Sequence, residues 1–221
     1  MSNPSLDRGN HLLRRFAPLA GVLYAGLTAG GDLVIGEFPD GTTSGAQLQD
    51  FYAAHGAHVA LGGALFEWAA VCFAVFGLAL WSRVRERAVS AVVAGLVLVG
   101  VVLETGAELY DAGIFQFLGQ HGADGHIAPA ALQAWQLPIT EIGTSGGLVL
   151  FVIGIALAAF GYRALPRWIA GAAVVLVAAA FTTVSFLASL VFLLWAAVAG
   201  VALAVRPPRP VTAREPAPSL G

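Results

Sequence analysis

Long apolar runs dominate the pattern of hydrophobic and polar positions and predict helices that cross a membrane. A transmembrane helix needs about 20 mostly apolar residues to cross about 30 Å of hydrocarbon. Four runs reach that length with at most two acidic residues inside them: residues 16–36, 56–82, 88–109 and 142–162. Each of these runs is therefore predicted to form one transmembrane helix.

A fifth apolar run, residues 168–205, has 38 residues without a charge. As a single helix it would measure about 57 Å at 1.5 Å per residue, nearly twice the hydrocarbon thickness. The polar group Thr182, Thr183 and Ser185 lies near the middle of the run. We therefore expect two short spans joined by a tight turn at that group. The predicted fold class is an all-α, polytopic bundle of six transmembrane helices.

The composition excludes several classes of protein. Of the 221 residues, 58% are apolar and 11% are charged, and the mean hydropathy is +0.80. Soluble domains carry about 45–50% apolar and about 25% charged residues, so neither a soluble enzyme nor a disordered chain fits. The chain has no lysine, which excludes a lysine Schiff base and a P-loop. The single cysteine, Cys72, excludes a disulfide framework and a thiolate metal cluster.

The arginines predict the orientation in the membrane. All eleven basic residues are arginine, and they lie in four places: Arg8, Arg14, Arg15; Arg83, Arg85, Arg87; Arg163, Arg167; and Arg206, Arg209, Arg214. Cytoplasmic loops retain Lys and Arg, and outer loops lack them. Both termini are therefore expected in the cytoplasm, which requires an even number of spans and agrees with six.

Three segments follow from this layout. Residues 1–15 are expected to form a cytoplasmic N-terminal segment, and residues 16–205 the six-helix transmembrane domain. Residues 206–221 contain five prolines and are expected to form a disordered cytoplasmic tail. The first apolar stretch is longer than the apolar region of a usual signal peptide, so it is interpreted as a retained span.

Local signals refine the helix ends and contacts. Ser44, followed three residues later by Gln47, predicts a capping box that opens the second helix well before the membrane. Residues 129–136 are interpreted as a short helix at the membrane interface. Gly26 and Gly30 form a GxxxG pair in the first span, where a neighbouring helix can approach closely.

Acidic residues inside the spans are the candidate functional groups, because a charge in the membrane is costly unless it is paired or hydrated. Counting from the arginines places Glu67 about 8 Å and Glu104 about 6 Å below the outer boundary. Four helices thus bring carboxylates to a similar level in the outer leaflet. We call this set the predicted vestibule: Asp32, Glu67, Glu104, Glu108, Glu141 and Thr144.

Two interpretations of these groups compete. In the first, the acids line an outward-opening cavity that binds a solute, an ion or a proton. Four histidines, His55, His58, His121 and His126, add ligands for a divalent metal, with the HxxH pair His55 and His58 as the candidate metal site. In the second, the acids at the rim point to water, and Asp32 and Glu67 bond to neighbouring polar side chains.

Several features resemble uncharacterised bacterial membrane families with six spans, catalogued as domains of unknown function. The similar features are the start at residues 20–31, the arginine turn at 83–87, the RALPRW turn at 163–168, and the fused closing pair of spans. The resemblance covers most of residues 16–205 and implies the six-span layout. It implies no catalytic residues, because those families have none assigned.

The sequence therefore predicts a non-enzymatic, multi-pass protein of a bacterial plasma membrane with an outward-facing acidic vestibule. The alternatives are a metal-dependent membrane enzyme that uses His55, His58, Glu104 and Glu108, and a purely structural membrane subunit. No cofactor is predicted beyond that divalent metal. The expected partners are the lipid bilayer and another membrane protein or a second copy, and no nucleic acid.

Overall fold

A computed structural model of the chain describes residues 16–87, 90–141, 146–180 and 185–205. Within these ranges the protein is mainly helical, with short loops between the helices, and contains no strand. The elements are the 3₁₀ turn η1 (Ala17–Leu19), α2 (Ala20–Ile35), α3 (Gly45–Glu86), α4 (Ala91–His121), α5 (Pro129–Glu141), α6 (Gly146–Ala156), the π-helical turn η2 (Leu157–Gly161), α7 (Arg167–Ala180) and α8 (Ser185–Val205). The all-α class is confirmed. The predicted segments 1–15 and 206–221 lie outside the described residues.

Three helices are long and apolar enough to cross a membrane, namely Ala17–Ile35, Gly45–Glu86 and Ala91–His121. The remaining apolar helices of the described chain, in α6–η2, α7 and α8, are shorter. The protein is therefore a membrane-embedded helical bundle. Within the run 168–205, the chain forms α7 and α8 instead of one long helix. The expected turn at Thr182 and Thr183 lies outside the described residues.

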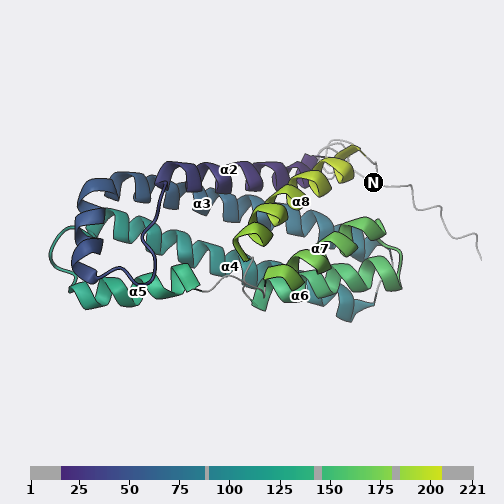
Figure 1. Cartoon of the computed structure of the whole chain (residues 1–221). Coiled ribbons are helices and arrows are strands. Elements are labelled where there is room, and N and C mark those ends of the chain that lie inside the picture. The colour runs from purple at the N-terminus through teal and green to yellow at the C-terminus, as the bar shows by residue number, and fades with distance from the viewer. Residues whose placement is uncertain (1–15, 88–89, 142–145, 181–184, 206–221) are drawn as a thin grey trace, which may run out of the picture.

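The long helices α3 and α4 run side by side through the bundle and carry both of its hydrophobic cores (Figure 1). One core joins α2, α3, α4, α6, α7 and α8 around Phe73, Phe76 and Phe151. The second core lies around Leu48, Tyr52 and Leu118, where α5 packs against the first half of α3. The linkers that contain the described arginines lie at the opposite end from this second core (Figure 1). We call these two ends the arginine end and the distal end.

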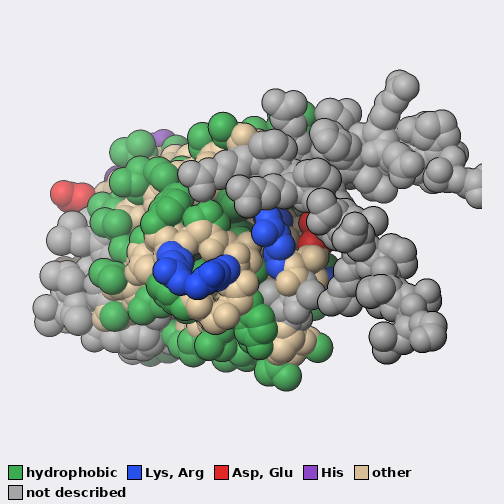
Figure 2. Space-filling model, turned by 90° about the vertical axis from the view of Figure 1, so that its right-hand side faces the viewer, with side chains coloured by type: hydrophobic (Ala, Val, Ile, Leu, Met, Phe, Trp, Pro, Cys, Tyr) green, Lys and Arg blue, Asp and Glu red, His purple; other side chains and the backbone are tan. Residues whose placement is uncertain are grey.

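The arginine end is visible in Figure 2, where blue side chains face the viewer. They belong to the described basic residues, which are Arg83, Arg85, Arg87, Arg163 and Arg167. Arg83 donates a hydrogen bond of 2.6 Å to the backbone carbonyl of Leu203 in the last turn of α8. That carbonyl is one of the last four of the helix and has no partner within it, so Arg83 ties the end of α8 to α3.

Glycines set how closely the helices approach one another. Gly21 of α2 lies against the backbone of Ala196 in α8, and Gly56 of α3 lies against Gly119 of α4. The predicted GxxxG pair behaves differently. A Cβ added at Gly26 would meet no atom within 4 Å, and a Cβ at Gly30 would meet only Leu65, at 3.9 Å. The close contact of α2 with α8 therefore depends on Gly21, because a side chain at Gly26 would meet no neighbouring helix.

The capping box at the start of α3 is confirmed. The Ser44 backbone amide donates to Gln47 Oε1 at 3.1 Å, and the Gln47 amide donates to Ser44 Oγ at 3.4 Å. The Ser44→Ala substitution is expected to lower the free energy of unfolding by about 1 kcal/mol, because an amide of the first turn loses its acceptor. Equilibrium unfolding in detergent measures this loss. The Ser44→Asn control keeps an acceptor and should match the parent protein, and equal losses in both variants would refute the role of the cap.

Candidate functional site

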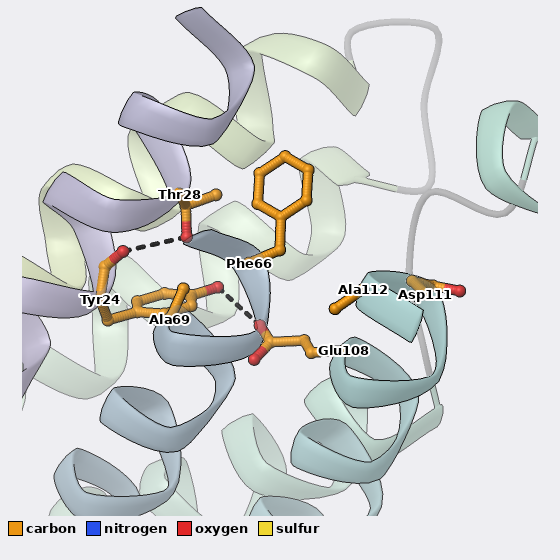
Figure 3. A pocket seen from close by; sticks show the side chains of 7 residues that line it. All are labelled: Tyr24, Thr28, Phe66, Ala69, Glu108, Asp111 and Ala112. Carbon is orange, nitrogen blue, oxygen red and sulfur yellow. Dashed lines mark hydrogen bonds between the residues drawn. The ribbon is translucent and has the colours of Figure 1, made fainter. Parts of the chain in front are cut away.

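A small pocket lies between α2, α3 and α4, in the part of the bundle where three helices bring polar side chains together (Figure 3). Its volume is about 110 Å³. The lining residues are Tyr24 and Thr28 from α2, Phe66 and Ala69 from α3, and Glu108, Asp111 and Ala112 from α4. Glu108 is thus the one member of the predicted vestibule that lines this pocket.

Tyr24 and Glu108 form the centre of the pocket. The Tyr24 hydroxyl donates a hydrogen bond of 2.8 Å to Glu108 Oε1 across the gap between α2 and α4 (Figure 3). The Tyr24 ring is buried and held by Phe73 and Phe192, with ring centroids 5.3 Å and 6.5 Å away. Packing therefore fixes the direction of the Tyr24 hydroxyl, so this hydrogen-bond donor is already in position when a ligand binds.

The second oxygen of Glu108 has no hydrogen-bond partner among the described residues. Oε2 is buried, and the same lack of a partner holds for Thr105 Oγ1, three residues earlier on α4 and outside the pocket lining. Residues three apart on a helix are neighbours on its surface. A buried polar atom without a partner costs about 1–3 kcal/mol, and more for a charged group. The Glu108 oxygen in the pocket therefore indicates that the site accepts another polar group.

The charge of the lining favours a cation. Glu108 and Asp111 are both carboxylic acids, and no basic residue is among the described residues that line the pocket. Asp111 is exposed, whereas the Glu108 oxygen is buried deeper between the helices. Thr28 donates its own hydroxyl proton to the Tyr24 carbonyl at 2.9 Å. Asp111 therefore adds an exposed acidic residue to the lining of the pocket that holds Glu108.

Glu108 lies well away from the arginine end. It follows the first residue of α4, Ala91, by 17 positions, which corresponds to about 26 Å along the helix axis. Glu104 lies one turn closer to the arginine end on the same helix. It is the one acidic residue that is buried among the described residues, at 9% exposed, and Gly147 of α6 packs against its backbone. The sequence estimate made Glu67 the deepest acid by its distance below the outer membrane boundary. That distance is a different quantity from burial inside the protein, so the estimate stays a prediction.

Asp32 and Glu67 are not among the residues that line the pocket. Both side chains are exposed. Glu67 accepts a hydrogen bond of 2.9 Å from the Gln116 side-chain amide. The remaining predicted vestibule residues are Glu141, whose side chain is not described, and Thr144, which lies outside the described residues. The described part of the chain thus brings Glu108 alone of that set into contact with the pocket.

The histidines do not converge on these acids. His55 and His58 are exposed on the distal part of α3, and His55 stacks on Phe51 at a centroid distance of 4.9 Å. Gly56 packs against Gly119, which is 11 residues, or about 16 Å of helix, beyond Glu108. Zinc ligands lie about 2.0–2.2 Å from the ion, so His55 and Glu108 cannot share one metal.

The other two histidines lie near the end of α4. His121 Nδ1 is 2.9 Å from Asp124 Oδ2, and His126 is exposed in the following loop. Within the described residues, no group of three His, Cys, Asp or Glu side chains is arranged to hold a metal ion. The metal prediction for His55 and His58 gains no third ligand from this part of the chain.

Sequence reasoning missed the hydrogen-bond donor of the site. Tyr24 lies one turn before Thr28 in an apolar span, and a tyrosine hydroxyl in such a span needs a partner. This need for a hydrogen-bond partner was the signal in the sequence that could have identified Tyr24 as part of the site. The spacing of Glu104, Glu108 and Asp111 puts them on one face of α4, but the neighbouring helices that close the pocket cannot be inferred from spacing.

No family model, curated protein or solved structure matches this chain. The resemblance to six-span families of unknown function therefore stays a prediction, and the site is interpreted from its own geometry.

Proposed function

We propose that this chain is a non-enzymatic, six-span protein of a bacterial plasma membrane that takes up a small cation at Glu108 in exchange for a proton. The buried Glu108 Oε2 without a hydrogen-bond partner, beside a cavity of about 110 Å³, carries this proposal. A water molecule occupies about 30 Å³ in the liquid, so the cavity has room for a small hydrated group. Tyr24 holds the other carboxyl oxygen in place throughout the exchange.

The exchange follows from the cost of burying a charge. An isolated carboxylate in an apolar environment is unfavourable, so Glu108 either holds a proton or faces a cation. One cation enters and one proton leaves, which keeps the net charge of the pocket constant. The exposed Asp111 supplies an acidic entrance next to Glu108, and it attracts cations from solution.

The orientation is part of the same proposal. The described arginines gather at one end of the bundle (Figure 2), and cytoplasmic loops retain arginine. With that end and both termini in the cytoplasm, the pocket opens toward the outer side. The shorter helices α6–η2, α7 and α8 complete the count of six spans in this proposal, because they are apolar and belong to the same bundle: α6 packs beside α4, α8 beside α2, and α7 against α6 and α8.

The proposal predicts that a small cation releases protons from the purified protein. NaCl or KCl is added to the detergent-solubilised protein in a lightly buffered solution, and a pH-sensitive dye reports the change. We expect release approaching one proton per chain, and we expect Glu108→Gln to abolish it because the neutral side-chain amide has no acidic proton to release. The chloride salt of N-methylglucamine at equal ionic strength should release far less, since that cation exceeds the cavity.

Glu67→Gln is the matched control. Glu67 is also an acid in a spanning helix, but it is exposed and bonded to Gln116 outside the pocket. This variant should release protons like the parent. Equal release from the parent protein and Glu108→Gln, or equal release with all three salts, would refute exchange at Glu108 and favour a structural role. Proteoliposome flux measurements with the same salts then show whether the bound cation crosses the bilayer.

A further inference from the structure

A second cavity lies on the surface of the bundle between α7 and α8, and its lining differs in chemical character from that of the acidic pocket. Its volume is about 440 Å³. Trp168, Gly171 and Val175 line it from α7, and Val191, Leu194 and Val198 line it from α8. Val175 and Leu194 are 66% and 62% exposed, so the cavity is an open groove and not an enclosed void.

Trp195 supports the floor of this groove. Its ring is 4% exposed, and its Nε1 donates a hydrogen bond of 2.9 Å to the Ile169 carbonyl. The one polar atom of the indole is thus bonded to α7, and the remaining ring presents carbon atoms. The groove therefore offers an apolar surface to its occupant, because the described residues that line it are aliphatic, glycine or tryptophan.

One end of the groove lies beside two arginines. Trp168, from the first turn of α7, lines the groove. Two exposed arginines, Arg163 and Arg167, lie in the linker before α7 and at its first residue, directly before Trp168. An apolar groove with cationic side chains beside one end matches a molecule with one apolar tail and an anionic head.

The backbone at Arg163 supports a role for its side chain. Arg163 has a φ of 54°, a left-handed conformation that usually takes glycine at the end of a helix. The Ala164 amide donates to the Ala158 carbonyl at 2.9 Å and closes the wide turn that ends η2. An arginine in this conformation costs more than glycine would. This unfavourable backbone conformation occurs at a position where the side chain is exposed and charged.

We infer that this groove binds an anionic phospholipid from the leaflet at the arginine end. One acyl chain lies between α7 and α8, and Arg163 and Arg167 bind the phosphate. Trp168 lies at the level of the headgroup, where tryptophan is enriched in membrane proteins.

The test measures lipid binding to the full chain in detergent by native mass spectrometry. Phosphatidylglycerol and phosphatidylcholine with identical acyl chains are the two probes. We expect the phosphatidylglycerol complex to dominate. The double variant Arg163→Gln/Arg167→Gln should weaken that complex about 25-fold, because each arginine near a lipid phosphate contributes a factor of about five. The Arg85→Gln/Arg87→Gln control removes equal charge from another linker and should change binding less than about threefold.

A second pair of variants tests the acyl chain. Val175→Phe fills the groove from an exposed position, and Val102→Phe adds the same bulk at a position of α4 that is 61% exposed and outside the groove. Val175→Phe should reduce the phosphatidylglycerol complex, and Val102→Phe should not. Equal binding of the two lipids, equal effects of the two arginine pairs, or equal effects of the two phenylalanines would overturn the proposal.

Discussion

The Gly21→Leu substitution is expected to destabilise the bundle by about 3 kcal/mol or more, whereas Gly26→Leu in the same helix leaves it intact. A Cβ at position 21 would lie 2.5 Å from the carbonyl oxygen of Ala196 and 3.0 Å from Phe76 Cδ2. The first contact is with backbone, so α2 and α8 must move apart. Overpacking of a close contact costs about 1–3 kcal/mol and sometimes more, and the whole α2–α8 interface shifts here.

Gly26→Leu is a stringent control because it adds the same side chain to the same helix. Gly26 is exposed, and a Cβ there meets nothing within 4 Å. Leucine also favours a helix over glycine by about 0.8 kcal/mol, so this variant should equal or exceed the parent in stability. Unfolding of both variants by SDS titration, followed through tryptophan fluorescence, gives the comparison. Similar stability of the two variants would show that α2 and α8 do not pack as described.

The second large effect concerns the Tyr24–Glu108 pair. Tyr24→Phe removes the donor from Glu108 Oε1, whose partner oxygen Oε2 already lacks a hydrogen bond. We expect a loss of about 2 kcal/mol in the free energy of unfolding, near the upper end for hydrogen bonds between transmembrane helices. In a Glu108→Leu background the same change should cost almost nothing, because the acceptor is gone. The difference is the coupling energy of the pair.

The double variant Tyr24→Phe/Glu108→Leu separates a functional role from a structural one. Replacing both partners by apolar groups of similar shape is nearly neutral or stabilising. We therefore expect stability within about 1 kcal/mol of the parent protein, together with complete loss of cation-linked proton release. A double variant as unstable as Tyr24→Phe alone would mean that the polar pair is there to hold the bundle together.

Helix formation could be predicted from the chain because it depends on local signals. The run 168–205 is too long for one span, and the chain does form two helices there. Ser44 and Gln47 close the predicted capping box within a single turn. Helix ends were less predictable. The third apolar run ends at Leu109, but α4 continues to His121 because Ile114 and Leu118 pack into the second hydrophobic core, at the distal end.

The amino-acid sequence alone determined that this chain forms apolar helices, where its acids and arginines lie along them, and that those acids are costly in a membrane. It did not determine which acid turns inward, because spacing gives the phase within a helix and not the rotation of that helix against its neighbours. The tertiary structure decided this. Packing at Gly21 and Phe73 holds α2 so that Tyr24 reaches Glu108, while Asp32 and Glu67 remain on exposed faces.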